Sequence, residues 1–168
     1  LSYNNYNDIF AGLDILFSIK KEPSTIIIKH ANPCGVSKNK SPLKSFQNAY
    51  ACDPLSAFGG VIVCNFKIKK NVAIEIDKNF LEVIVAKGFD AEAIKILQAK
   101  KNLRIIDISN FKYKNASRFK LFNGSFLMQD EDSIIFNKKD LKFVTKLKPT
   151  AKEVKEMEFS FNICKYVK

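Results

Sequence analysis

Residues 24–30 read STIIIKH, and this short stretch sets the architecture of the chain. Its β-branched residues favour a strand, and three consecutive isoleucines are typical of a strand that is buried on both faces. The run ends in Lys29 and His30, the only histidine of the chain. We expect the following residues, 31–35 (ANPCG), to form a loop that turns both side chains into one crevice at the strand's end.

The rest of the first two thirds alternates between short strand-like and helix-like segments. Ser41 and Pro42 suit a helix start, because serine caps well and proline fits the first turn. The predicted strands cover residues 24–30, 59–66, 81–86 and 103–108, and the predicted helices residues 7–19, 42–53, 72–76 and 90–99. This alternation predicts an α/β sandwich with helices on both faces of the sheet.

The last third is less regular. Residues 118–132 predict an extended segment with a turn at Asn123 and Gly124. Thr150 and Glu153 have the spacing of a capping box, so a final helix begins there. Nothing in the sequence ends this helix before Lys168.

Length and composition indicate a globular chain. The 168 residues fit one domain or part of a larger one, and the balance of 46% hydrophobic and 27% charged residues is typical of folded proteins. Apolar runs are too short for a membrane span, and no signal peptide is apparent. The chain starts with Leu1, which suggests an excerpt from a longer protein. We expect a cytoplasmic location.

The four cysteines are Cys34, Cys52, Cys64 and Cys164, and none forms a C-x-x-C pair. This spacing fits neither a zinc site nor a disulfide framework. Three of them lie in apolar segments, where we expect buried thiols in a reducing compartment.

The net charge of +11 leaves a nucleic-acid-binding module as an alternative function. Against it, the lysines are scattered along the chain in pairs and only two arginines are present, whereas a nucleic-acid surface concentrates its charge and favours arginine. A steep salt dependence of oligonucleotide binding would support this alternative.

The Lys29–His30 pair has two interpretations when the residues are taken alone. It is either a lysine that reaches water beside an ordinary histidine, or part of a site. A zinc-deaminase site fails on its ligands, because Asn32 stands where the glutamate of H-x-E is required and no cysteine lies three residues after Cys34. We therefore expect no metal.

Five blocks carry a resemblance to a known family. They are LSYNN (1–5), KHANPCGV (29–36), AYACDPLSAFGGVIV (49–63), FLEVIVAKGFDAEAIKIL (80–97) and NICKYVK (162–168). In this order they resemble the transformylase portion of the bifunctional enzymes that join 5-aminoimidazole-4-carboxamide ribonucleotide (AICAR) formyltransferase to inosine monophosphate (IMP) cyclohydrolase. Each block alone is moderately specific, but five in register over nearly the whole chain are specific together.

The resemblance implies a fold and a reaction. Residues 1–168 would be the first of two cytidine-deaminase-like α/β/α subdomains, without a catalytic zinc, while the second subdomain and the cyclohydrolase domain are absent. The reaction would transfer a formyl group from the co-substrate 10-formyltetrahydrofolate to the 5-amino group of AICAR. The complete protein would be a homodimer with a shared active site, so we expect the 168 residues alone to be inactive.

The resemblance also implies site residues. Lys29 and His30 occupy the positions of the family's catalytic pair. Asn5, Gly59 and Glu82 fall where the family contacts the nucleotide, and glutamate there suits ribose hydroxyls.

Overall fold

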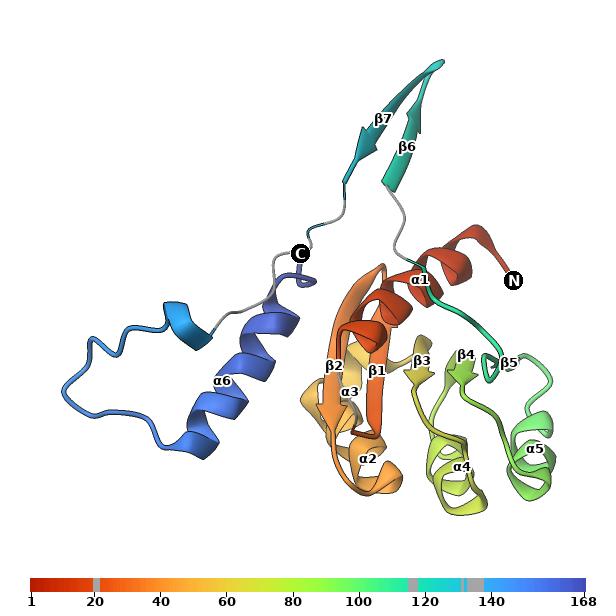
Figure 1. The fold of residues 1–168 in the computed structure, drawn as a ribbon. Coiled ribbons are helices and arrows are strands. Elements are labelled where there is room, and N and C mark those ends of the chain that lie inside the picture. Colours follow the sequence, from red (N-terminus) through yellow and green to blue (C-terminus); the bar gives the residue numbers. More distant parts are fainter. Residues whose placement is uncertain (20–21, 115–117, 131, 133–137) are drawn as a thin grey trace. The chain divides into compact units, whose positions relative to one another are not determined.

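The structure, a computed structural model, describes residues 1–19, 22–114, 118–130, 132 and 138–168. These residues form two compact units: residues 1–111 together with 165–168, and residues 112–164. The first unit is built on a five-stranded sheet with the order β2-β1-β3-β4-β5 (Figure 1). Its strands are β1 (Ser24–Lys29), β2 (Asn32–Lys38), β3 (Gly60–Cys64), β4 (Leu81–Ala86) and β5 (Arg104–Asp107). Strand β1 is antiparallel to both of its neighbours, whereas β3, β4 and β5 are parallel.

Helices cover both faces of this sheet. Helix α1 (Tyr3–Ser18) contacts β1 and β3 on one face, where a side chain at Gly12 would collide with Ile28 and Val63. The opposite face is covered by α2 (Pro42–Cys52), α4 (Lys70–Asp77) and α5 (Ala91–Gln98), and the short α3 (Pro54–Ala57) leads from α2 toward β3. The predicted α/β class, with a buried sheet between two helical layers, is confirmed.

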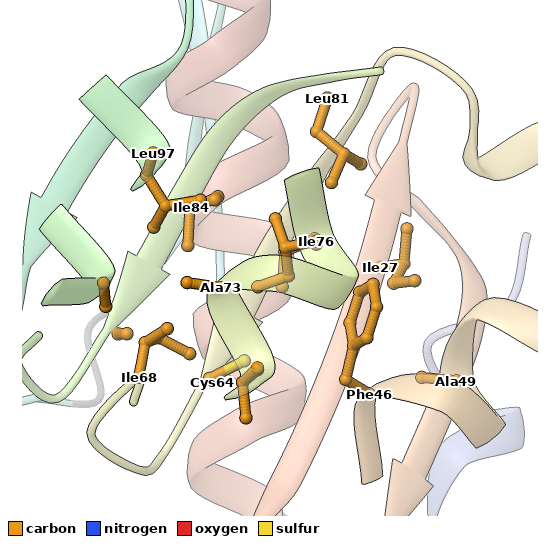
Figure 2. Close-up of a cluster of buried hydrophobic side chains, with 14 of the residues drawn as sticks. Ile27, Phe46, Ala49, Cys64, Ile68, Ala73, Ile76, Leu81, Ile84 and Leu97 are labelled. Atoms are coloured by element: carbon orange, nitrogen blue, oxygen red, sulfur yellow. The ribbon is translucent and has the colours of Figure 1, made fainter. Parts of the chain in front are cut away.

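The central strands are buried on both faces, as the isoleucine run predicted. On the face of α2, α4 and α5, Figure 2 shows Phe46, Ile76 and Leu97 gathered with Ile27 and Ile84 of the sheet, all at most 1% exposed. Each such side chain contributes roughly 1.5–3 kcal/mol through burial. This core therefore fixes the position of β1 and of its last residue.

The predicted loop at residues 31–35 is wrong. The chain turns within two residues, His30 and Ala31, and then forms the edge strand β2, with Asn32 opposite Lys29. Proline is acceptable in an edge strand, and Pro33 lies next to a register shift. Gly35 has no side chain, and this allows α2 to pack closely on β2: a Cβ atom at residue 35 would lie 1.9 Å from the carbonyl oxygen of Ala49. Pro33 and Gly35, which indicated a loop in the sequence, thus lie in a strand.

The first helix begins earlier than predicted, at Tyr3 and not at residue 7. Ser2 is its N-cap: its hydroxyl accepts from the Asn5 N–H, and Asn5 Oδ1 accepts from the Ser2 N–H. Two other predicted starts are confirmed, with Ser41 capping α2 and Asp90 capping α5. Helix α4 begins at Lys70, two residues before its predicted start.

The second unit contains a hairpin and a helix. Strands β6 (Arg118–Phe122) and β7 (Ser125–Gln129) pair across Asn123 and Gly124, which confirms the predicted turn. After a short 3-10 turn (Lys138–Asp140), α6 (Ala151–Cys164) begins with the predicted capping box and ends before Lys168. Strands β6 and β7 are exposed throughout, and none of the residues of α6, all of which are described, is buried.

The prediction of three buried cysteines is wrong. Only Cys64 is buried, because it lies in the central strand β3; Cys34 is half-buried, and Cys52 and Cys164 are exposed near the ends of their helices. Within the part of the chain that the structure describes, no helix is long and apolar enough to cross a membrane.

Candidate active site

Lys29 and His30 line one open pocket of about 370 Å³ at the end of β1. Its other lining residues are Asn32, Pro33, Cys34, Asp53 and Ser56. Lys29 is half-buried, and its Nζ donates a 2.6 Å hydrogen bond to the carbonyl oxygen of Phe58. His30 is exposed to solvent. The structure thus brings the two predicted catalytic side chains to the same pocket.

The turn that presents this pair has an unusual backbone. His30 and Ala31 have φ values of 55° and 56°, as in a two-residue type I′ hairpin turn, a conformation that asparagine and glycine prefer. The carboxylate of Asp8, from α1, accepts a 2.6 Å hydrogen bond from the Ala31 N–H. The turn is therefore tied to the helix that crosses the sheet.

The three predicted substrate-binding residues also lie together. Asn5 is buried, and its Nδ2 donates a 2.9 Å hydrogen bond to Glu82 Oε2. Gly59 has a φ of 72° and donates from its N–H to the carbonyl oxygen of Phe80. A Cβ atom at Gly59 would lie 4.0 Å from Glu82 Oε1. Residues from three distant segments thus form one polar cluster.

The pocket residues and the polar cluster lie at the same end of the strands. Lys29 ends β1, while Gly59 precedes β3 and Glu82 is the second residue of β4. Because β1 runs antiparallel to β3, its carboxyl end meets their amino ends. Lys29 reaches Phe58, the neighbour of Gly59, so it links the pocket to the polar cluster. Ligands of parallel sheets usually bind at the carboxyl ends of the strands, and here only β1 follows that rule.

The pocket combines the ammonium group of Lys29, the carboxylate of Asp53 and the thiol of Cys34. Hydrogen bonds from the side chain and backbone of Ser56 hold the pKa of Asp53 below its ordinary value, so this carboxylate is charged. Burial, together with the negative charge of Asp53, raises the pKa of the Cys34 thiol. Such a pocket offers hydrogen-bond donors and acceptors for moving a proton between polar reactants.

Sequence analysis did not identify Asp8, Asp53 or Ser56 as site residues. Asp53 was predicted only as the last residue of a helix, although it also caps α3. Nothing in the spacing relates Asp8 to Ala31, which lies 23 positions away. Among the described residues, no three histidine, cysteine or acidic side chains gather in a way that could hold a metal ion.

The sequence of this chain matches a known family and resembles known proteins along its whole length. The family described as AICARFT/IMPCHase bienzyme matches residues 1–168. The bifunctional purine biosynthesis protein PurH of Rhodospirillum rubrum is 43% identical over 170 residues, and that of Trichodesmium erythraeum is 39% identical over 168. Both matches cover 100% of this chain and 32% of the relative, so the chain spans about a third of their length.

The solved structures include a match to the apo dCMP deaminase of cyanophage S-TIM5, with a TM-score of 0.47 and 12% identity. It covers 63% of this chain and 99% of that chain. The descriptions of the matching family and of the two PurH relatives do not support the nucleic-acid-binding alternative.

Proposed function

The chain belongs to the AICARFT/IMPCHase bienzyme family, and we propose that it carries the Lys29–His30 part of a site that transfers a formyl group to the 5-amino group of AICAR. The observation that supports this most is that both side chains line one pocket, which Lys29 connects to the Asn5–Glu82 cluster. The donor is 10-formyltetrahydrofolate, and the product feeds IMP formation in purine biosynthesis.

His30 manages the proton in this proposal. The AICAR amine is conjugated with a carboxamide-bearing imidazole, so it is a weak nucleophile and must lose a proton as it attacks the formyl carbon. An imidazole titrates near neutral pH and suits this task. The exposed position of His30 at the pocket leaves its ring accessible to a substrate.

Lys29 supplies positive charge. Its ammonium group donates to the formyl oxygen as negative charge develops there, or orients the carboxamide of AICAR. One of its three N–H donors is used by the Phe58 carbonyl, which holds the side chain in place and leaves two for substrate.

The polar cluster binds the nucleotide. The carboxylate of Glu82 accepts hydrogen bonds from ribose hydroxyls, and Gly59 lets the backbone approach the ligand closely. Asn5 offers its amide, which already contacts Glu82 at 2.9 Å. Buried Asn5 thus also fixes the carboxylate that receives the ribose.

The remaining parts of the proposal concern the complete protein. It is a cytoplasmic homodimer that needs no metal for this reaction, contains a second, similar subdomain and also carries IMP cyclohydrolase activity. The present residues, taken as the first subdomain, form only part of the site, because the partner subunit contributes the remainder.

The test of the catalytic pair uses the complete protein and an assay of formyl transfer to AICAR. His30→Ala is expected to lower kcat at least about 100-fold, the range of general acid–base catalysis. Lys40→Ala changes an exposed lysine two residues after the end of β2, serves as the control and should leave kcat unchanged. Near-normal turnover by the His30→Ala enzyme would refute the assignment.

A second test concerns the 168-residue chain alone. We expect no formyl transfer above the uncatalysed rate, because residues from elsewhere in the dimer are missing. Measurable transfer by the chain alone would contradict this part of the proposal.

A further inference from the structure

We propose that Asp8 is a positioning residue that holds the His30–Ala31 turn, and with it the side chains of Lys29 and His30, in the geometry needed for formyl transfer. The inference rests on the proposed function of this pair. Asp8 itself lies on α1 and contacts the backbone of the turn, so it acts through its neighbours and not on the substrate.

The turn needs support because its residues disfavour its shape. Side chains with a Cβ atom rarely adopt a positive φ, yet His30 and Ala31 both do so in succession. Backbone strain of this kind persists only where the surrounding structure imposes it, and it is concentrated at functional sites. Without an outside contact, the turn would be free to relax and to move both side chains.

The Asp8 carboxylate provides that contact. Its 2.6 Å hydrogen bond from the Ala31 N–H is short and involves a charged acceptor, which makes it stronger than a neutral one. Ala31 is only 8% exposed, so its N–H has little access to water and depends on this acceptor. The bond therefore fixes the backbone directly beside His30.

The helix that carries Asp8 is itself rigidly held. Ile9, Leu13 and Leu16 of α1 are at most 5% exposed and anchor the helix to the sheet. Asn5 lies three residues before Asp8 and so projects from the same side of the helix. One helix thus fixes two parts of the site, with Asn5 bonded to Glu82 and Asp8 bonded to the catalytic turn.

Four variants of the complete protein test the role of Asp8. Asp8→Ala removes the acceptor and should lower kcat at least about tenfold, because small displacements of reacting groups are costly, while KM for AICAR changes less than about threefold. Asp8→Asn keeps an oxygen acceptor in place and should recover kcat to within about threefold of wild type. Asp8→Glu keeps the charge but displaces the oxygen, and should lose at least about fivefold in kcat. Asn7→Ala, an exposed neighbour on the same helix, is the control and should match wild type.

A double-variant comparison separates positioning from general stability. In a His30→Ala background, Asp8→Ala should lower kcat by a smaller factor than it does in the wild-type background, because the part of its effect that passes through the position of His30 is already lost. An equal loss in both backgrounds would indicate a structural role and overturn the proposal. So would wild-type kcat in Asp8→Ala or, should that variant fail to fold, in Asp8→Glu. Failure of the proposed function would show separately, as undiminished kcat in His30→Ala alone.

Discussion

Among single residues, His30 and Ala31 explain most about how the candidate site is formed. Two successive residues at positive φ reverse the chain in the shortest possible way, so the last side chain of β1 and the first of the turn reach one pocket. A longer loop, as the sequence suggested, would position them less accurately. The local conformational cost is offset by the bond to Asp8 and by the pairing of β1 with β2.

Substitutions at Ala31 measure the conformational cost of the turn in the 168-residue chain. Ala31→Val should reduce the free energy of unfolding by about 2 kcal/mol or more, because a β-branched residue at a φ of 56° is strongly disfavoured. Ala31→Gly should stay within about 0.5 kcal/mol of wild type, since relief of strain offsets the greater freedom of glycine in the unfolded chain. Urea denaturation gives both values, and equal stability of the two variants would contradict the argument.

The cysteines should differ in reactivity according to their burial. Burial raises the pKa of Cys64 to about 12, so at pH 8 only about one molecule in ten thousand carries the reactive thiolate. In the native 168-residue chain, a thiol reagent should modify Cys52 and Cys164 quickly, Cys34 more slowly, and Cys64 only after denaturant is added. A Cys64→Ala variant should show the same native reaction and lose only the last step. Rapid native modification of Cys64 would show that β3 opens readily.

Among the secondary structure elements, those with strong hydrophobic patterns were predictable. Residues 81–86 were predicted as a strand and form β4 with the same limits, because Val83, Ile84 and Val85 are β-branched and Gly88 marks a turn after them. Strand β2 was missed because Pro33 and Gly35 indicate a loop unless the neighbouring α2 and the sheet edge are known. The early start of α1 was missed because its capping box uses Asn5 in place of the usual glutamate or glutamine.

At Gly35 the backbone of β2 lies close against α2, and a larger residue there should separate the two elements. Gly35→Ala would place a Cβ atom 1.9 Å from the Ala49 carbonyl oxygen, a backbone atom that cannot move without shifting the helix. We expect a loss of at least about 3 kcal/mol in the free energy of unfolding, or failure to fold. Val36→Ala, a half-buried neighbour in β2, should cost about 1 kcal/mol and is the control. Wild-type stability of Gly35→Ala would mean that the two elements are farther apart.

The start of α6 should respond to acid. Hydrogen bonds from the N–H and hydroxyl of Thr150 hold the pKa of Glu153 below its ordinary value of 4.5. The lowered pKa means that the charged form is favoured in the helix, so the stabilisation is present above pH 4.5 and is lost as the pH falls through the lowered value. NMR titration of Glu153 in the 168-residue chain should give a pKa below 4.5, and Thr150→Ala should raise this pKa part of the way toward 4.5, because it removes the hydroxyl and keeps the N–H donor. An unchanged pKa in Thr150→Ala would exclude the Thr150 hydroxyl as a cause and leave the Thr150 N–H, which alanine keeps, as its source.

For the chain as a whole, the site depends on contacts that no local pattern contains. The site residues come from four segments of the chain: Asn5, Lys29, Gly59 and Glu82. Only the order of the strands brings the carboxyl end of β1 beside the amino ends of β3 and β4. The resemblance to a family supplied these residues before the fold was known. It could not supply the link through Phe58 or the bond from Asp8, because these follow from side-chain geometry.

The two compact units should differ in stability within the 168-residue chain. Among the residues that the structure describes, every buried one lies between Asn5 and Ile108, so the hydrophobic stabilisation belongs to the first unit. An isolated hairpin and a helix of 14 residues are marginal in water by themselves. Hydrogen exchange should therefore be slowest for the amides of β1, β3 and β4, and faster by about a hundredfold or more for those of β6, β7 and α6. Chain shortening to residues 1–111 should leave the slow amides protected, whereas equal protection in both units, or loss of protection on shortening, would show that they unfold as one.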